Sequence, residues 1–459
     1  MKYLVLLPLV LACTPETVED SPQEPSLPMV EGVAAAEDHD DDPKVVEVHL
    51  TASRTEKDWI DGGATPVWAY NGQVPGPLIH ARVGDTLRVV FTNDLPDPTT
   101  IHWHGLRIDN AMDGVPAVQE PIEPGETFTY EFVLPDAGSY WYHPHIRGHE
   151  QVDRGLYGPL VVHEAQESEP TVDRDRYFVL DDVALQENGR HYGFSTGGMD
   201  GMHGRHGNVL LANGQTELIT DTVQPGTVER WRIVNTANAR LMYADVRGAD
   251  WRVVGVDGGL LEEPYTTDRL RLPVGRRFDV EVIPRADAEK LKLRVLIPSQ
   301  TGFDRFPMFE AAIEGPPAST AVPIWPAAAM PDPVPETQEV DVELDFGSGG
   351  MMGMAWVING QRYEEGDSIP IQGNVPTRIH LRDVSGAGHP FHLHGQFFEV
   401  LSRNGVEGDI PGPLDTIHVG GDDELELFTM FDNPGLWLGH CHILEHAELG
   451  MMTSFDVTP

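Results

Sequence analysis

The sequence predicts an all-β protein made of three β-sandwich domains. Short runs such as residues 86–93 (TLRVVFTN) and 277–284 (RFDVEVIP) alternate apolar and polar side chains and are separated by Gly and Pro turns. Alternation with a period of two is typical of strands that bury one face. The tripeptide Asn-Gly-Gln also recurs at residues 71–73, 213–215 and 359–361, at separations of 142 and 146 residues. No long stretch has the period of a helix.

The recurring tripeptide indicates where the three domains lie. Each Asn-Gly is a hairpin-turn signal. Each is followed at a similar distance by a glycine turn and a strand-like run, at residues 84–93, 226–235 and 373–383. A repeat of this length indicates domains of one ancestry rather than a solenoid. We therefore expect domains at residues 44–168, 169–315 and 338–459, with the Pro-rich residues 316–337 as a linker over the surface.

The first 13 residues, MKYLVLLPLVLAC, have the form of a bacterial lipoprotein signal in which Cys13 is the lipidated residue. The apolar run is too short to span a bilayer as a helix. A conventional cleaved signal peptide is the alternative, because Leu11 is bulky for its place in such a signal. In both cases we expect an exported protein, in the periplasm or at the cell surface. A lipid on Cys13 would anchor it to the membrane.

Residues 14–43 are rich in Pro, Glu and Asp, and they predict a disordered tether after the anchor. The whole chain has a formal net charge of −42, which excludes nucleic-acid binding as a main function and favours cationic or neutral partners. Cys13 and Cys441 are the only cysteines, so no disulfide is expected. We expect a monomer.

The candidate functional residues lie in four clusters. Residues 440–452 (HCHILEHAELGMM) place one cysteine among histidines, with a thioether nearby, which is the ligand set of a blue copper centre. Three further clusters contain alternating histidines, at residues 101–105 (IHWHG), 142–145 (YHPH) and 389–395 (HPFHLHG). In a strand, residues i and i+2 share a face, so each pair aims two imidazoles at neighbouring points. A single pair would be a weak signal, but four clusters supply ten histidines, enough for four copper ions.

The order and spacing of these clusters resemble those of the multicopper oxidases, the laccase-like family. The resemblance implies three cupredoxin-like Greek-key β-sandwich domains, with copper ligands in the first and third only. It assigns His389, Cys441 and His446, with axial Met451, to a type 1 copper. It assigns His102 and His392 to a type 2 copper. The type 3 pair would be bound by the six remaining motif histidines: His104, His143, His145, His394, His440 and His442.

The reaction also needs protons. Asp113 matches the acidic residue that family members place near the type 2 copper, where a cation should lower the pKa of the carboxyl. Several bacterial relatives have a proton-relaying glutamate directly after the last histidine ligand, but here that residue is Ala447. Glu445 and Glu448 are the nearby substitutes. The predicted catalytic groups are Asp113, His389, Cys441 and Glu448.

The resemblance implies an oxidase that takes single electrons from phenols or aromatic amines and reduces dioxygen to water. Two methionine-rich segments, residues 197–207 (GGMDGMHGRHG) and 349–354 (GGMMGM), offer thioethers that suit Cu(I). A metal-ion oxidase, such as a cuprous oxidase serving copper tolerance, is therefore the main alternative. Against it, residues 384–388 (VSGAG) lack the Asp and Met that dedicated cuprous oxidases place before the blue-copper histidine.

Two other classes fit the sequence less well than an oxidase. A copper-binding lipoprotein without turnover needs no open trinuclear site, and the presence of all ten motif histidines argues against it. A copper nitrite reductase would lack the histidine pairs that the type 3 coppers require. The sequence therefore favours the oxidase.

Overall fold

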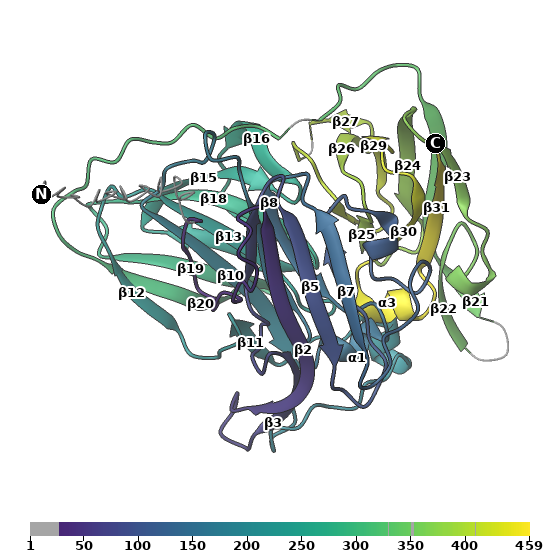
Figure 1. Cartoon of the computed structure of the whole chain (residues 1–459), viewed down its shortest axis with the longest axis horizontal. Helices are drawn as coiled ribbons and strands as arrows, with labels where there is room; N and C mark the ends of the chain where they lie inside the picture. Colours follow the sequence, from purple (N-terminus) through teal and green to yellow (C-terminus); the bar gives the residue numbers. More distant parts are fainter. Residues whose placement is uncertain (1–26, 329, 350–352, 409) are drawn as a thin grey trace, which may run out of the picture.

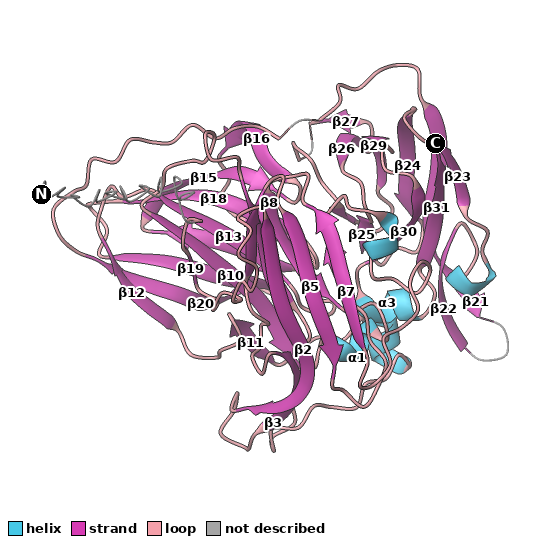
Figure 2. Ribbon diagram, in the orientation of Figure 1, coloured by secondary structure: helices cyan, strands magenta, loops and turns pink. Residues whose placement is uncertain are grey.

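The computed structural model describes residues 27–459 except 329, 350–352 and 409. Nearly all of its regular structure is strand, arranged as three successive two-layered β-sandwiches (Figures 1 and 2). The described helices are single turns in loops: η1 (Asn110–Met112), α1 (Gly148–Gln151), α2 (Gly198–His203), η3 (Tyr363–Glu365) and α3 (Leu444–Glu448). The predicted all-β class is confirmed. Within the described part of the chain, no helix is both long and apolar enough to cross a membrane.

The first sandwich contains two four-stranded sheets. Strand β5 has a strictly alternating burial pattern, as its sequence predicts, and pairs in parallel with β2. Between the sheets lies a core rich in aromatic side chains, including Trp103 and Tyr130. One sheet has the order β3 (Thr65–Tyr70), β2 (Val45–Lys57), β5 (Thr86–Asn93) and β7 (Thr127–Val133). The other has the order β4 (Ile79–Arg82), β9 (Gly158–His163), β8 (Gly138–His143) and β6 (His102–His104).

The second sandwich packs its two sheets around Trp231 and Phe309. Its larger sheet has the order β1 (Val30–Glu31), β10 (Arg174–Val183), β13 (Glu229–Asn235), β18 (Arg277–Pro284), β15 (Ala249–Val256) and β16 (Gly259–Tyr265), and β11 (Val209–Ala212) also pairs with β10. The other sheet has the order β12 (Ile219–Val223), β20 (Gly302–Ile313), β19 (Lys290–Ser299), β14 (Met242–Arg247) and β17 (Leu270–Leu272).

The third sandwich carries the cysteine cluster. One sheet has the order β22 (Gly353–Ile358), β21 (Gln338–Gly349), β24 (Pro376–Asp383), β29 (Glu424–Met430), β26 (Phe398–Arg403) and β27 (Val406–Glu407). The other has the order β23 (Ile369–Gln372), β31 (Met452–Thr458), β30 (Gly435–Cys441), β25 (His389–Leu393) and β28 (Thr416–Val419). Strands β25 and β30, which hold two of the four histidine clusters, are therefore neighbours.

The three Asn-Gly turns are structurally equivalent. Asn71, Asn213 and Asn359 have φ angles of 52°, 50° and 53°, and the following glycines have φ between 73° and 75°. Positive φ at both positions is what a tight hairpin turn requires. Each asparagine Oδ1 also accepts a hydrogen bond of 2.7 or 2.8 Å from a backbone N–H of an adjacent strand. The repeated tripeptide therefore marks the same turn in each sandwich.

The prediction of a disordered tether is wrong for its second part. Val30 and Glu31 form β1, which pairs in parallel with β10, and Val30 is only 7% exposed. The N–H of Ala36 donates to the carbonyl of Leu78 at 2.8 Å. Glu31 binds two arginines of β10. These contacts with distant parts of the chain order residues whose average composition predicted disorder, while residues 14–26 lie outside the described part.

The Pro-rich residues 316–337 lie against the second sandwich. Trp325 is buried, and its Nε1 donates to Glu281 at 2.8 Å. The N–H of Ala318 donates to the carbonyl of Pro225 at 2.7 Å. The route of this green segment, outside the strands of the second sandwich and on to the third, is visible in Figure 1.

Candidate metal centre

The pairing of β25 with β30 decides where the histidines of the third sandwich point. His392 lies opposite His440, and Phe391 lies opposite Cys441. Because side chains alternate along a strand, His392 and His440 share one face of the sheet, whereas His389 and Cys441 share the other. One strand therefore supplies two different groups of ligand atoms, one on each side.

The first group contains His389, Cys441 and His446. The Sγ of Cys441 lies 3.4 Å from Nδ1 of His389 and 3.7 Å from Nδ1 of His446, and the two nitrogens are 3.2 Å apart. Helix α3 returns the chain so that His446 faces the cysteine, and the buried Met451 follows directly. The N–H of Cys441 donates to the carbonyl of Met451 at 3.1 Å. The predicted residues of a blue copper site are thus brought together.

Burial sets the protonation of this group. It raises the pKa of the Cys441 thiol far above its ordinary value, whereas it lowers the pKa of His389 to about 4. The imidazole is therefore neutral at pH 7 and free to bind a metal, but the thiol must lose its proton when it binds one. A thiolate with two imidazoles and a weak thioether is a donor set that fits copper.

The second group lies on the other face of the strand, at the interface of the first and third sandwiches. Strands β6 and β8 of the first sandwich place His102 opposite His143. Candidate ligand atoms within 4.8 Å of one another form three sets: His102 with His392 and His394; His102 with His104 and His143; and His145 with His394 and His440. His442 closes the group, with its Nε2 3.3 Å from Nδ1 of His104. All eight predicted trinuclear histidines therefore converge on one buried region.

Three of these imidazoles have one nitrogen fixed and the other unpaired. His102, His143 and His392 donate through Nδ1 to backbone carbonyls at 2.9, 3.1 and 2.9 Å. Their Nε2 atoms are buried and have no hydrogen-bond partner among the described residues. Buried polar atoms are normally paired. Unpaired nitrogens that converge beside fixed ones are what a metal site with oriented ligands requires, so the group fits copper ions.

Burial also keeps the cluster uncharged. It lowers the pKa of His440 to about 3. The pKa values of His104, His143, His145, His394 and His442 fall well below the ordinary value, chiefly by burial and next by neighbouring imidazoles or arginine. Neutral imidazoles do not repel one another as cations would, and each keeps a lone pair for a metal.

Asp113 lies where the sequence predicted it, beside the imidazole cluster. It is fully buried, and its Oδ2 accepts from Nδ1 of His394 at 2.9 Å. Its Oδ1 lies 3.2 Å from Nδ1 of His102. One carboxylate thus contacts a histidine of the first sandwich and a histidine of the third.

The two candidate substitutes for the missing glutamate differ in position. Glu448 lines a cavity of about 60 Å³ together with Ala447, His145 and His440, and it lies 3.3 Å from His149. Glu445 does not line that cavity. It is fully buried, burial raises its pKa to about 7, and its oxygens accept from Asn238 and from the backbone of Arg205. A role for Glu448 in proton delivery stays a prediction.

A cavity of about 670 Å³ opens beside the cysteine site. Its wall includes His446 and four residues of the methionine- and histidine-rich segment: Met199, Met202, His203 and His206. The rest of the lining is largely apolar, with Leu241, Val274, Ile297 and Ile443 among its residues. The second methionine-rich segment is only partly described, because residues 350–352 lie outside the described part.

Sequence analysis missed several residues that contact the ligands. Trp356 of β22 stacks on His446 with ring centroids 4.2 Å apart, and its Nε1 donates to the carbonyl of Gly201 in α2 at 2.7 Å. Asp415 lies 3.3 Å from His104 and is held by Arg277. The only sequence signal for the contact between Asp415 and Arg277 was a pair of adjacent arginines at the start of an apolar strand. Such a pair does not identify the residue that it will contact.

The comparisons with known proteins agree with this geometry. Three sequence profiles, each described as multicopper oxidase, match residues 52–167, 184–290 and 336–459. Multicopper oxidase MmcO of Mycobacterium tuberculosis is 30% identical, with 86% of this chain and 84% of that protein covered. Laccase-1 of Botryotinia fuckeliana is 28% identical, with coverages of 86% and 79%.

A solved structure is also similar. The multicopper oxidase of Campylobacter jejuni, titled a metallo-oxidase, has a TM-score of 0.81 and 27% identity, with 95% of this chain and 96% of that chain covered. The predicted cupredoxin-like sandwich fold is thereby confirmed, and copper is the cofactor that the family binds. The three profile matches, the match to a relative over most of both chains and the converging histidine clusters show that this chain belongs to the multicopper oxidase family.

Proposed function

We propose that this oxidase is laccase-like and takes single electrons from small phenols or aromatic amines while it reduces dioxygen to water. The observation that carries the proposal is the position of Cys441. Its side chain joins the site beside the large cavity, while His440 and His442, its covalent neighbours, reach the buried imidazole cluster. Copper bound at the first site would accept single electrons from the reductant, and copper bound at the second would pass four of these electrons, with four protons, to each dioxygen that is reduced to two waters.

The ligand assignment follows the same proposal. His389, Cys441 and His446 hold the type 1 copper, with Met451 as the axial ligand. His102 and His392 hold the type 2 copper, and the type 3 pair is held by His104, His143, His145, His394, His440 and His442. Asp113 orients His394 by accepting its Nδ1 proton. All these ligands come from one chain, which supports a monomer as the working unit.

The cavity of about 670 Å³ supports an aromatic reductant, because its volume and mostly apolar wall suit a small organic molecule. His446 is part of that wall, so a bound ring would lie against a blue-copper ligand. The laccase name of one relative and the metallo-oxidase title of another are both compatible with such a pocket.

A second candidate is oxidation of Cu(I), and a specific observation favours it. Met199 and Met202 are 69% and 40% exposed, although methionine is usually buried, and both face the cavity that contains His446. Thioethers and imidazoles bind Cu(I) well. Helix α2 is held beside the copper site by the hydrogen bond from Trp356. The same pocket could therefore receive a soft metal ion.

The first prediction tests the assignment of Cys441. The Cys441→Ser variant should lose the blue absorption band and oxidase turnover, because the thiolate alone produces the intense colour. Copper content measured by elemental analysis should fall from about four to about three per chain, since the imidazole cluster keeps its ligands. Wild-type turnover in this variant would show that the assigned electron path is wrong.

The second prediction separates the two reductants. Replacing Met199 and Met202 by Leu, and His203 and His206 by Gln, should lower kcat/KM for Cu(I) at least about tenfold more than kcat/KM for a phenol, because only the soft metal ion needs thioether and imidazole ligands. The control variant replaces Met29 by Leu and His49 by Gln, which are outside the cavity. Equal losses on both substrates would mean that the segment only supports the fold, and no loss on Cu(I) would reject the second candidate.

We also propose that the protein is exported and anchored to a membrane by a lipid on Cys13. The support is the leader sequence, since Cys13 lies outside the described residues. Cys13→Ala should move the protein from the membrane fraction to the soluble fraction or block processing of the leader. A mature N-terminus well downstream of Cys13 in the native protein would instead identify an ordinary secretory signal.

A further inference from the structure

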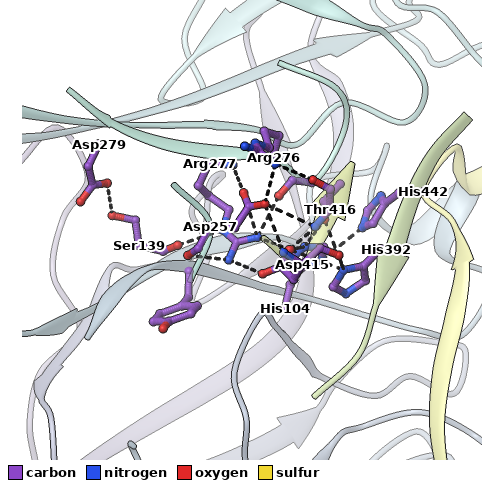
Figure 3. A network of polar contacts seen from close by, with 12 residues as sticks. His104, Ser139, Asp257, Arg276, Arg277, Asp279, His392, Asp415, Thr416 and His442 are labelled. Carbon is purple, nitrogen blue, oxygen red and sulfur yellow. Dashed lines mark hydrogen bonds and ion pairs between the residues drawn. The ribbon is translucent and has the colours of Figure 1, made fainter. Parts of the chain in front are cut away.

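We infer that a turn of the second sandwich, residues 273–277 between β17 and β18, positions the imidazoles of the trinuclear cluster. This sandwich contains none of the four histidine clusters. The inference rests on the proposed assignment of those clusters to copper. It adds three positioning residues: Gly275, which packs directly against two ligands, and Arg276 and Arg277, which act through Thr416 and Asp415. Figure 3 shows the two arginines with these partners.

Gly275 brings the backbone of the turn directly against two imidazoles. A Cβ at this position would lie 3.0 Å from Cε1 of His104 and 3.1 Å from Cδ2 of His442. Gly275 also has φ +85°, a conformation that other residues rarely adopt. His104 belongs to the first sandwich and His442 to the third. The turn therefore packs against one ligand from each side of the interface.

Arg277 acts on His104 through Asp415. The fully buried guanidinium donates to both oxygens of Asp415, at 2.7 and 2.6 Å, and its Nε donates to the carbonyl of Ser139 at 2.9 Å. Asp415 Oδ1 in turn lies 3.3 Å from Nε2 of His104. A carboxylate can only accept here, so it fixes the proton on Nε2. The Nδ1 of His104 is then the free nitrogen, and it points to Nε2 of His442.

The charges in this contact determine its strength. Burial opposes ionisation of Asp415, but Arg277 and the hydrogen bonds of His104 and His392 outweigh it and hold the pKa of Asp415 well below its usual range. The arginine fork matches the carboxylate in a bidentate geometry, which fixes direction as well as distance. A lysine could keep the charge but not this geometry.

Arg276 acts in the same way on His392. Its NH1 group donates to the carbonyl of Thr416 at 2.6 Å and to Asp257 at 3.0 Å. The carbonyl of Asp415 accepts from Nδ1 of His392 at 2.9 Å, and the Thr416 hydroxyl lies 3.2 Å from the same nitrogen. The arginine thus holds the start of β28, which orients His392.

The opposite side of the turn faces the reductant cavity, where Pro273 and Val274 form part of the wall. Of these five consecutive residues, Pro273 and Val274 therefore line the cavity. Gly275 contacts ligands of the trinuclear cluster directly, and Arg276 and Arg277 act on them through Thr416 and Asp415. Remote contacts of this kind tune metal affinity and ligand orientation. The second sandwich is consequently part of the copper centre, although no ligand comes from it.

The test compares Gly275→Ala with Gly125→Ala. Both glycines have nearly the same φ, +85° and +84°, but a Cβ at Gly125 meets nothing within 4 Å. In Gly275→Ala, the near-ultraviolet shoulder and the type 2 electron paramagnetic resonance signal should be lost, and copper should fall from about four toward about one per chain, with the blue band kept. Gly125→Ala should match the wild type.

A second pair of variants tests the hydrogen bonds without adding bulk. Arg277→Lys should alter the shoulder and the type 2 signal but not the blue band, whereas Arg247→Lys, at an exposed arginine that pairs with Asp245, should alter none of the three signals. Unchanged cluster signals in both Gly275→Ala and Arg277→Lys would overturn the inference. Loss of the blue band together with the cluster signals would also overturn it, because the turn would then support the whole fold. A wild-type protein without cluster signals would instead refute the proposed function.

Discussion

The register of β25 against β30 is the constraint on which the copper centre depends. His392 opposite His440 and Phe391 opposite Cys441 place imidazoles on one face and the thiol on the other. A slip of one residue would exchange the faces, because side chains alternate with a period of two. The fixed register is supported by pairing on both outer sides, with β28 next to β25 and β31 next to β30. The placement of both ligand groups therefore depends on the correct pairing of four strands.

Local patterns predicted much of this architecture. The Asn-Gly turns predicted equivalent hairpins, and Asn71, Asn213 and Asn359 adopt them because their conformation depends mainly on the tripeptide. The histidine spacings predicted which imidazoles share a face, since strand geometry is regular. The order at Val30 was not predicted, because it comes from pairing with β10, far along the chain. The contact of Arg277 with Asp415 spans 138 residues, and no local pattern specifies such a partner.

Buried ion pairs and hydrogen bonds join the sandwiches. Cys441, the cysteine of the described residues, is free, so no disulfide contributes there. Arg230 of β13 is buried and pairs both with Asp279 of its own sandwich and with Glu164 of the first sandwich, and Asp279 also accepts from Ser139 of the first sandwich at 2.6 Å. Such pairs give little net stability, but loss of one partner is costly because it leaves a charge uncompensated. They therefore specify how the sandwiches dock more than how firmly each one folds. The position of Gly275 relative to His104 and His442 therefore depends on how the second sandwich docks against the other two.

The two faces of β30 also separate two tasks that selection can alter independently. Residues of α2 line the cavity beside the cysteine site, whereas the imidazole cluster lies on the other face of the strand. On the proposed function, changes at the cavity-lining residues of this segment would alter the choice of electron donor more than the imidazole cluster. A library that randomises Met199, Met202, His203 and His206 would therefore vary the reductant cavity while the cluster ligands stay the same. The strand makes the protein a modular scaffold for oxidases.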